Sequence, residues 1–452
     1  MNIKTNSKEV KKNDIFICIH DQYEDRHKYI KDIKEASAII IDKNINKKIA
    51  VPLIKVNNTN DTLFQIYNDY YENHLLELNI FAVTGTDGKT TTASIIKQLI
   101  SNYNKIACLG TNGFNYYNYN IKTKNTTPDI GTTLKYAKIL KDNNIKNLVM
   151  EASSEGLLHN RCKNLKFKRA LITNVTGDHL NIHKTFDNYL KSKLKLFTYL
   201  SKDGLGIINT DDISYNYIKN MKIKFISYGT KKNADYRILN IKTYNNKTRF
   251  SIKHKNKTYN ICSPLLGKFN VYNLTASIAL VHSLGIDIES IIKNIKKIKP
   301  IPGRMNIFKT KKEASIILDY AHTSHATKEI LKFAKSTNPK KIITVLGSAG
   351  GREKEKRKEI GKIATSLSDK VIFTTDDPRY EKVSNIINDM LLEVKTKNYT
   401  IIKNRKHAIK NAIKDANKGD LILILGKGTD NYMAIRNKYK KYNDLNIIKK
   451  YT

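Results

Sequence analysis

Short apolar runs separated by longer polar or amphipathic stretches recur along most of the chain. In the first 80 residues the runs are brief, at 14–20, 36–42 and 49–56, and a helical pattern follows at 61–71. Apolar runs typical of buried strands lie at 80–84, 105–110, 147–153, 169–175, 205–210, 314–320, 341–347, 370–376, 399–403 and 420–426. Strands that alternate with helices predict an α/β fold with largely parallel sheets.

Two interruptions divide this pattern. Residues 236–262 contain Asn-Asn and Lys-Asn turns between short β-type runs, which predicts hairpins, and 271–284 then reads as a helix. The segment KKIKPIPGRM holds two prolines and a glycine and marks a domain boundary. We therefore expect three domains, a small α/β unit at 1–80, a central unit at 81–302 and a doubly wound, Rossmann-like unit at 303–452.

The chain is strongly basic, with 81 Lys and Arg against 41 Asp and Glu among 452 residues and a net charge of +40. Such a charge raises nucleic-acid binding as a hypothesis. The basic residues are spread along the whole chain, however, which favours a general compositional bias. Four widely spaced cysteines predict neither a zinc site nor a disulfide framework. The sequence has no signal-peptide pattern and no apolar run of membrane-spanning length.

The stretch FAVTGTDGKTTTASIIKQLI reads as a strand, a glycine turn and a helix. Main-chain N–H groups around Gly85 and Gly88 can approach phosphate oxygens, and the following helix N-terminus attracts anions. Lys89 would reach the terminal phosphates, and the Thr90 hydroxyl would bind Mg²⁺. The common motif has a glycine where this chain has Val83, so the loop is a shorter version. The central domain is predicted to be P-loop ATPase-like.

Polar clusters follow several other apolar runs, at the sheet edge where open α/β folds bind ligands. Glu151 ends one run, where a carboxylate beside a phosphate loop suits Mg²⁺; a simple loop acid is equally consistent. The remaining clusters are Asp178, His179 and His183; Asp319 and His322; Asp376, Asp377 and Arg379; and Gly426, Lys427 and Asp430. Their number exceeds what packing alone requires.

Three further polar residues lie on predicted helices or at the domain boundary. Lys193 lies on an amphipathic helix, where a lysine is usually solvated. Asn270 suits a helix cap, and its amide would also hydrogen-bond an adenine edge. Arg304 follows the proline-rich boundary, from which a guanidinium can swing onto a phosphate.

Taken in order, these motifs resemble those of the Mur ligase family over nearly the whole chain. The resemblance rests on TGTDGKTT, NTTPD, the Glu151 segment, DHLNIH, GKFNVYN, PGRM, DYAHT, DDPR and GKG. The chain is most similar to the branch that adds the third residue of the peptidoglycan stem peptide. Folylpolyglutamate synthetases share the G-T-x-G-K loop but lack NTTPD and DYAHT.

The resemblance implies an ATP- and Mg²⁺-dependent amide ligase whose domains hold, in order, a uridine nucleotide, ATP and the incoming amino acid. The acceptor would be UDP-N-acetylmuramoyl-L-alanyl-D-glutamate. ATP would phosphorylate its glutamate carboxylate, and the amine of a diamino acid would attack the resulting acyl phosphate. We expect a cytoplasmic, monomeric enzyme of peptidoglycan synthesis without nucleic-acid or membrane partners.

The resemblance also implies roles for individual residues. Catalysis would depend on Lys89, Glu151, His179 and Lys193. Mg²⁺ ligands would be Thr90, Glu151, His179 and a carbamylated Lys193. ATP would contact Gly85, Thr86, Asp87, Gly88, Lys89, Thr90, Thr91, Asn270, Asn273, Arg304, Asp319 and His322. The UDP-muramyl substrate would contact Ser7, Thr126, Thr127, Ser153, His159 and Arg161. The amino acid would contact Asp376, Asp377, Arg379, Gly426 and Asp430.

Several positions depart from the family's usual residues. They are Asn6 and Lys8 around Ser7, Asp87 in the ATP loop, Glu155, His159, Asp377, and Thr429 with Asp430. Arg379 suits a bidentate grip on the distal carboxylate that meso-diaminopimelate has and lysine lacks. Asp377 would add negative charge beside Arg379, which favours a lysine-type substrate. We expect meso-diaminopimelate, with L-lysine as the alternative.

Three other functions remain open from the sequence. A different ligase of the Mur and folylpolyglutamate superfamily would keep the ATP chemistry and use another acidic acceptor. A basic nucleic-acid-binding P-loop ATPase would show salt-sensitive stimulation by DNA or RNA. A catalytically inactive binding protein would not need Lys89, Glu151, His179 and Lys193, all of which are present.

Overall fold

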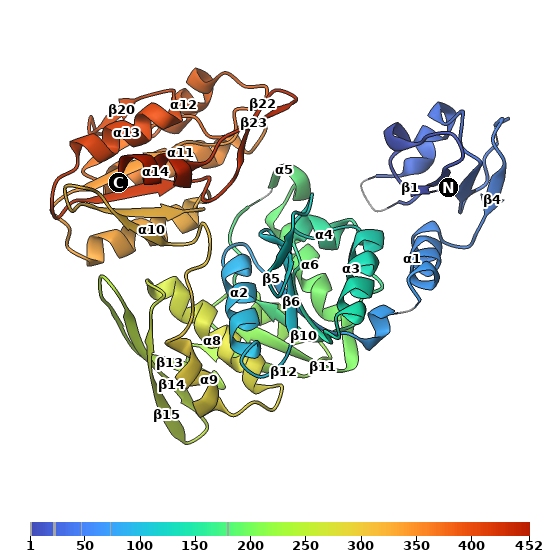
Figure 1. Ribbon diagram of the computed structural model, residues 1–452, viewed down its shortest axis with the longest axis horizontal. Helices are drawn as coiled ribbons and strands as arrows, with labels where there is room; N and C mark the ends of the chain where they lie inside the picture. The colour runs from blue at the N-terminus through green and yellow to red at the C-terminus, as the bar shows by residue number, and fades with distance from the viewer. Residues whose placement is uncertain (1, 21–23, 47, 73, 179) are drawn as a thin grey trace.

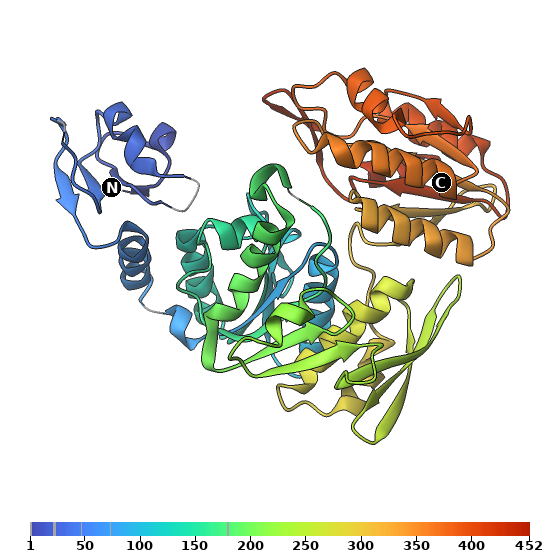
Figure 2. The same ribbon diagram turned by 180° about the vertical axis from the view of Figure 1, so that it is seen from behind.

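The computed structural model describes residues 2–20, 24–46, 48–72, 74–178 and 180–452. The chain forms three α/β units, each built on its own sheet, and this confirms the predicted fold class (Figure 1). In both views the N-terminal unit is set apart from the central unit, and α1 (Thr59–Tyr70) lies between them (Figures 1 and 2).

The N-terminal unit has a four-stranded parallel sheet in the order β1-β2-β3-β4. Its elements are β1 (Ile3–Lys4), η1 (Ser7–Glu9), β2 (Ile15–Ile17), η2 (Arg26–Asp32), β3 (Ala38–Ile41) and β4 (Leu53–Lys55), followed by α1 and η3 (His74–Glu77). Phe16 and Ile39 are fully buried on neighbouring strands of this small core.

The central unit has an eleven-stranded sheet in the order β15-β14-β13-β12-β11-β10-β5-β9-β6-β7-β8. Its strands are β5 (Asn79–Thr84), β6 (Ile106–Gly110), β7 (Gly113–Tyr116), β8 (Tyr119–Ile121), β9 (Asn147–Glu151), β10 (Phe167–Ile172), β11 (Leu200–Asn209), β12 (Phe225–Gly229), β13 (Tyr236–Thr243), β14 (Thr248–His254) and β15 (Lys257–Ser263). The adjacent strands β13-β12-β11-β10-β5-β9-β6 are parallel, and both edges of the sheet continue as antiparallel hairpins. The predicted hairpins at 236–262 are therefore confirmed.

Helices cover both faces of the central sheet. They are α2 (Lys89–Ile100), α3 (Ile130–Asp142), α4 (Ser154–Leu158), α5 (Leu180–His183), α6 (Phe186–Leu194), η4 (Lys195–Tyr199), α7 (Tyr215–Ile218), α8 (Lys268–His282) and α9 (Ile288–Ile295). Helices α2, α8 and α9 pack in one core, and α3 and α6 in another. Alternate side chains of a strand face opposite sides, so a sheet buried on both faces reads as a continuous apolar run.

The helix predicted over 271–284 begins earlier, at Lys268. Its N-cap is Gly267 at a φ of 92°, a left-handed value that glycine adopts without strain. Asn270 lies inside the first turn and donates from Nδ2 to the Leu266 carbonyl at 2.8 Å. The interpretation of Asn270 as the helix cap was therefore wrong.

The C-terminal unit has a six-stranded sheet in the order β16-β17-β21-β18-β19-β20, parallel except at β16. Its strands are β16 (Asn306–Lys309), β17 (Ser315–Asp319), β18 (Ile342–Leu346), β19 (Lys370–Phe373), β20 (Tyr399–Ile401) and β21 (Leu421–Leu425), with a separate hairpin of β22 (Tyr432–Ile435) and β23 (Lys438–Lys441). Its helices are α10 (Ser324–Ser336), α11 (Lys354–Leu367), α12 (Val383–Leu391), α13 (Arg405–Asp415) and α14 (Asp444–Tyr451). Two cores on opposite faces make it doubly wound, as predicted.

Candidate active site

The glycine loop joins the buried strand β5 to α2, and its neighbours leave no room for side chains. At Gly85 an added Cβ would lie 1.8 Å from Thr173 Oγ1, and at Gly88 it would lie 2.5 Å from Asn273 Oδ1. Gly88 also has a φ of 86°. The sequence therefore needs glycine at both positions, and the loop stays open to a phosphate at the start of α2.

Lys89 folds over the loop that precedes it. Its Nζ donates to the carbonyl oxygens of Gly85 at 2.8 Å and Thr86 at 2.9 Å. Burial lowers the pKa of Lys89, while the carboxylates of Glu151 and Asp87 oppose this shift. The ammonium is thus held at the mouth of the phosphate loop, where the negative charge of a bound polyphosphate would stabilise the charged form of Lys89.

Glu151 closes the opposite side of the loop. It pairs in register with Val83 on β5, which brings the ends of β9 and β5 together. Its Oε2 accepts from Thr90 Oγ1 at 2.9 Å and its Oε1 from the main-chain N–H of Thr111 at 2.8 Å. Glu151 is 1% exposed, so its carboxylate is fixed beside the Thr90 hydroxyl.

This donor pair fits Mg²⁺ bound to ATP. Among the described residues, no three His, Cys, Asp or Glu side chains gather closely enough to hold a metal by themselves. Mg²⁺ commonly uses one or two protein oxygens and completes its shell with phosphate oxygens and water. Thr90 and Glu151 supply such oxygens. The predicted ligand His179 lies outside the described residues.

Lys193 is buried beside the ATP loop, and the usual interpretation of a helical lysine as solvated is wrong here. It is 1% exposed, its Nζ donates to the Gly85 carbonyl at 2.7 Å, and it lies 4.3 Å from the Tyr189 ring centre. Burial and the nearby Lys89 charge lower the pKa of Lys193 well below 10.5. Lys191, by contrast, is exposed and pairs with Asp187 at 2.6 Å.

A cavity of about 440 Å³ lies between the central and C-terminal units. Of the predicted ATP contacts, it is lined by Asp87, Gly88, Thr91, Asn270, Asn273, Arg304, Asp319 and His322. Asn273 Nδ2 donates to Asn270 Oδ1 at 3.1 Å, so the two amides orient one another. These predicted ATP residues, from both units, therefore face one space.

Two C-terminal residues of this cavity are strongly constrained. Arg304 Nη2 donates to Thr90 Oγ1 at 3.2 Å, and the guanidinium lies 4.8 Å from the Tyr320 ring centre. Its buried Nε has no hydrogen-bond partner among the described residues, so this donor is available to a phosphate oxygen. Asp319 accepts from the main-chain N–H groups of Met305 and Ala321, both at 2.8 Å, and burial raises its pKa.

The predicted muramyl contacts of the central unit lie together beside Glu151. Thr127 Oγ1 donates to the Glu151 main-chain oxygen at 3.0 Å and lies 3.1 Å from Ser153 Oγ. Arg161 Nη1 donates to the Thr127 carbonyl at 3.1 Å, and Thr126 Oγ1 is 3.2 Å from Thr111 Oγ1.

The other two muramyl candidates lie at the ends of short helices. His159 is the C-cap of α4. Ser7 begins η1 in the N-terminal unit, two residues from Glu9, which lies 3.9 Å from the Lys124 ammonium near Thr126. The N-terminal unit therefore presents its Ser7 segment toward the Thr126 loop.

The predicted amino-acid residues divide into two groups. Lys427 is 1% exposed, and its Nζ lies 2.8 Å from Asp377 and 3.6 Å from both Asp376 and Asp430. Asp430 also accepts a hydrogen bond from the hydroxyl of Tyr320. Asp377 is thus paired with Lys427, and the expectation that it adds a free negative charge beside Arg379 is wrong.

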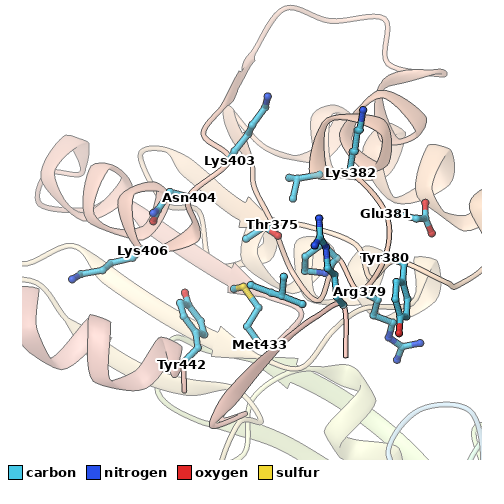
Figure 3. Close-up of a pocket in the computed structure, with 14 residues that line it drawn as sticks. Thr375, Arg379, Tyr380, Glu381, Lys382, Lys403, Asn404, Lys406, Met433 and Tyr442 are labelled. Atoms are coloured by element: carbon cyan, nitrogen blue, oxygen red, sulfur yellow. The ribbon is translucent and has the colours of Figure 1, made fainter. Parts of the chain in front are cut away.

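Arg379 instead lines a separate pocket of about 570 Å³ with Lys382, Lys403 and Lys406. Figure 3 shows Arg379 near the middle of this pocket, with Lys382 and Lys403 above it and Met433 below it in that view. Arg379 has a φ of 51°, and its main chain bonds to Ala434 and Arg436 of β22 and the following turn. The backbone is therefore held in an unusual conformation.

Sequence reasoning missed several residues at the cleft. Arg352 follows the Gly-Gly after β18, and burial and the nearby Arg379 lower its pKa, while Glu155 of the central unit opposes the shift. Lys356 forms an ion pair with the buried Asp178 across the two units. Thr323 and His325 contact Asp87. A Gly-Gly-Arg run after a strand was a usable signal for Arg352, but cross-domain partners have no sequence signature.

The comparisons with known proteins agree with this geometry. The model of the Mur ligase middle domain matches residues 83–281, and that of the Mur ligase glutamate ligase domain matches residues 303–428. The chain belongs to the Mur ligase family, and it is an ATP-dependent ligase.

Two curated relatives span nearly the whole chain. A UDP-N-acetylmuramoyl-L-alanyl-D-glutamate–2,6-diaminopimelate ligase 2 of Clostridium acetobutylicum is 35% identical, over 99% of this chain and 94% of that protein. A UDP-N-acetylmuramoyl-L-alanyl-D-glutamate–2,6-diaminopimelate ligase of Aquifex aeolicus is 36% identical, over 99% of this chain and 92% of that protein.

Solved structures share the fold. A UDP-N-acetylmuramoyl-L-alanyl-D-glutamate–2,6-diaminopimelate ligase is 27% identical with a TM-score of 0.68, covering 99% of this chain and 94% of that one. A MurF ligase from Thermotoga maritima in complex with ADP is 21% identical with a TM-score of 0.65, covering 94% and 93%. No helix in the described ranges is long and apolar enough to cross a membrane.

Proposed function

We propose that this ligase joins meso-diaminopimelate to UDP-N-acetylmuramoyl-L-alanyl-D-glutamate in peptidoglycan synthesis. The observation that carries the proposal is the Thr90–Glu151 contact at the phosphate loop, next to the Thr127–Ser153 cluster on one side and Arg304 on the other. A nucleotide phosphate and an acceptor carboxylate held at these two places would meet beside Glu151. The names of the Clostridium and Aquifex relatives give the same acceptor together with 2,6-diaminopimelate.

The three units would divide the work as the sequence predicted. Residues 1–80 would hold the uridine nucleotide, 81–302 ATP and 303–452 the amino acid. We also propose that the enzyme acts in the cytoplasm as a monomer. Closure of the C-terminal unit would exclude water, which would otherwise hydrolyse an acyl phosphate.

Phosphoryl transfer needs positive groups around the charge that develops on the transferred phosphoryl group. Lys89 and Arg304 are close enough to the loop to supply them, because they contact Gly85 and Thr90, respectively. Mg²⁺ held by Thr90 and Glu151 would neutralise further phosphate charge. The acceptor carboxylate oxygen would attack the terminal phosphorus, and ADP would leave.

The second step is amide formation. The amine of the diamino acid attacks the acyl carbon, the carbon–oxygen bond to phosphate breaks, and the amine loses a proton. Asp430 and Asp376 lie around Lys427, at the ends of β21 and β19. Carboxylates at these positions would orient a cationic amino acid.

The choice of meso-diaminopimelate rests on two guanidinium groups. Burial lowers the pKa of Arg352, and the nearby Arg379 charge lowers it further. A distal carboxylate between them would relieve this repulsion. Asp377 does not cancel Arg379, because it is held by Lys427 at 2.8 Å. L-Lysine has no carboxylate to offer these arginines.

The proposal is tested by following phosphate release from ATP with the muramyl dipeptide substrate and either meso-diaminopimelate or L-lysine. Release that depends on meso-diaminopimelate supports the assignment. Release with L-lysine alone would overturn the choice of amino acid. Release with neither, but with another acidic acceptor, would favour a different ligase of the same superfamily.

A further inference from the structure

The ATP loop is held from two domains at one residue, Asp87. Its main chain is hydrogen-bonded within the central unit: the N–H donates to Asn174 Oδ1 at 3.0 Å, and the carbonyl accepts from Thr173 Oγ1 at 2.6 Å. Its side chain contacts the C-terminal unit. Thr323 Oγ1 lies 3.3 Å from Asp87 Oδ1, and His325 Nδ1 lies 3.2 Å from Asp87 Oδ2.

These contacts join the start of α10 to the phosphate loop. Thr323 is the N-cap of α10, where its Oγ1 also accepts from the Ala326 N–H at 3.0 Å. His325 lies one residue into the helix, and both Asp87 and His325 line the ATP cavity. A movement of α10 away from the central unit would break both contacts, so they exist only while the two units are closed on the loop.

Asp87 places a negative charge where a polyphosphate must bind. The aspartate therefore creates a repulsion that this chain must offset. A protonated His325 offsets it directly and holds the domains together at the same time. Both effects favour ATP, because Arg304 and Asp319 of the same unit line the cavity in this arrangement.

We propose that His325 is a positioning residue that, when protonated, neutralises Asp87 and latches the C-terminal domain onto the ATP loop. Proton binding to His325 and ATP binding to the cleft are then coupled, and each strengthens the other. The inference rests on the proposed function only in requiring ATP to bind in this cleft; it makes no use of the acceptor or the amino acid.

The pKa shifts of both residues favour a protonated His325 beside a charged Asp87. The hydrogen bond to Asp87 raises the pKa of His325 above 6.5, against the opposing effect of burial. Burial would raise the pKa of Asp87, but His325, His322 and Lys89 bring it below 3.8. Because the closed state raises the pKa of His325, the latch is complete below the histidine's ordinary value and is lost as pH rises through the raised value.

Other charged groups act on this pair, and their effects must be separated from that of His325. Those that act on Asp87 or His325 are His322, Lys89, Lys193, Lys356, Asp319, Tyr189, Glu329 and Lys332. Burial lowers the pKa of Lys356 to about 8, so this lysine also titrates near the window of interest. Lys356→Arg keeps the positive charge but does not titrate in this pH range, so it separates the effect of Lys356 from that of His325.

The test is the dissociation constant of ATP, measured by calorimetry at saturating Mg²⁺ from about pH 5.5 to 8.5, the range in which histidine changes charge. The terminal phosphate of ATP itself titrates at about pH 6 to 7, so the readout is the difference between the protein and His325→Gln. Glutamine can still donate a hydrogen bond but carries no charge. His407→Gln, at an exposed position on α13, is the matched control.

We expect ATP affinity of the unaltered protein to fall about three- to tenfold more than that of His325→Gln across this range, a modest factor because His325 is 44% exposed. Lys356→Arg and His407→Gln should keep the full dependence. In an Asp87→Asn background, the change His325→Gln should have no further effect on the pH profile.

Two results would overturn the proposal. One is a His325→Gln protein, folded by circular dichroism, whose ATP affinity follows the same pH curve as the unaltered protein. The other is an undiminished effect of His325→Gln in the Asp87→Asn background, which would show that His325 does not act through Asp87. If the muramyl substrates fail in the ligase assay, the ATP-binding measurements still decide the role of His325, because ATP binding needs no acceptor.

Discussion

Lys193 Nζ lies 2.7 Å from the main-chain oxygen of Gly85, so a buried amine contacts the ATP loop itself. Its lowered pKa leaves more of the neutral amine at neutral pH. A neutral amine attacks CO₂ by forming a nitrogen–carbon bond and releasing a proton to water, which gives a carbamate. The nearby Lys89 charge opposes the ammonium form and would attract the carbamate.

Lys193→Met should therefore lower kcat about 10²- to 10³-fold, the scale expected for loss of an electrostatic group at a reacting phosphate. Removing dissolved CO₂ should slow the unaltered protein and have no effect on Lys193→Met. Lys191→Met, two residues away on the exposed face, is the control and should keep activity. Mass spectrometry of the intact protein at neutral pH, with and without bicarbonate, checks the modification. Equal CO₂ dependence in both variants would contradict this role.

Glu151→Gln should lower kcat by a similar factor and raise the Mg²⁺ concentration needed for half-maximal rate. The amide keeps the shape of the carboxylate but loses the charge that would bind the metal beside Thr90. Steady-state rates across a Mg²⁺ titration measure both effects. Glu289→Gln, an exposed acid on α9, should behave like the unaltered protein. An unchanged Mg²⁺ requirement in Glu151→Gln would remove Glu151 from the metal site.

Gly88→Ala separates backbone strain from steric conflict when it is compared with Gly285→Ala. Both glycines have nearly the same φ, 86° and 87°, but an added Cβ meets Asn273 only at Gly88 and meets nothing within 4 Å at Gly285. We expect Gly285→Ala to lose about 1 kcal/mol of unfolding free energy from the left-handed backbone, and Gly88→Ala to lose more because of the added contact with Asn273. Only Gly88→Ala should lose ATP binding. Urea unfolding and calorimetric ATP titration measure the two properties, and ATP binding retained by Gly88→Ala would contradict the loop geometry.

Arg352→Ala should raise the KM for meso-diaminopimelate about ten- to a hundredfold, as expected for losing one charged hydrogen-bonding group. The KM for ATP should change little, because Arg352 does not line the ATP cavity. Arg249→Ala, at an exposed position on β14 of the central unit, is the arginine control. Initial rates with each substrate varied in turn give the answer. A change in ATP KM alone would exclude Arg352 from amino-acid recognition.

Arg405→Met should destabilise the C-terminal unit by about 3–5 kcal/mol. Arg405 and Asp444 are both fully buried, and Nη2 lies 2.7 Å from Oδ2, so removing the arginine leaves an uncompensated carboxylate. Nη2 also donates to the Leu425 carbonyl at 2.8 Å, immediately before Gly426. Denaturant unfolding of Arg405→Met should show the loss, and a second change of Asp444→Leu should recover part of it. A cost below about 1 kcal/mol would contradict the buried pair.

The sequence predicted the fold well because its strands are buried on both sides. Residues 421–425 are apolar at every position and form the fully buried β21. Helix starts were harder to predict. Asn270 has the chemistry of a cap, but Gly267 begins the helix because its left-handed backbone is what the turn requires.

The candidate site was predictable where one chain segment carries the chemistry, as at Gly85, Lys89 and Thr90. Burial of Lys193 rather than Lys191 was not, because both lie on one short helix and only the loop above distinguishes them. The partners of Asp377 and Asp87 are 50 and 238 residues away. Such pairings depend on the packing of whole domains, which no local pattern encodes.

The acyl phosphate is tested most directly by placing ¹⁸O in the glutamate carboxylate of the UDP-muramyl substrate. If the carboxylate oxygen attacks the terminal phosphorus of ATP and the amine of meso-diaminopimelate then displaces phosphate, one labelled oxygen must pass into each phosphate released. Mass spectrometry of that phosphate should show one ¹⁸O per turnover, with the amide product retaining the other. Amide formation accompanied by unlabelled phosphate would contradict activation of the carboxylate by ATP.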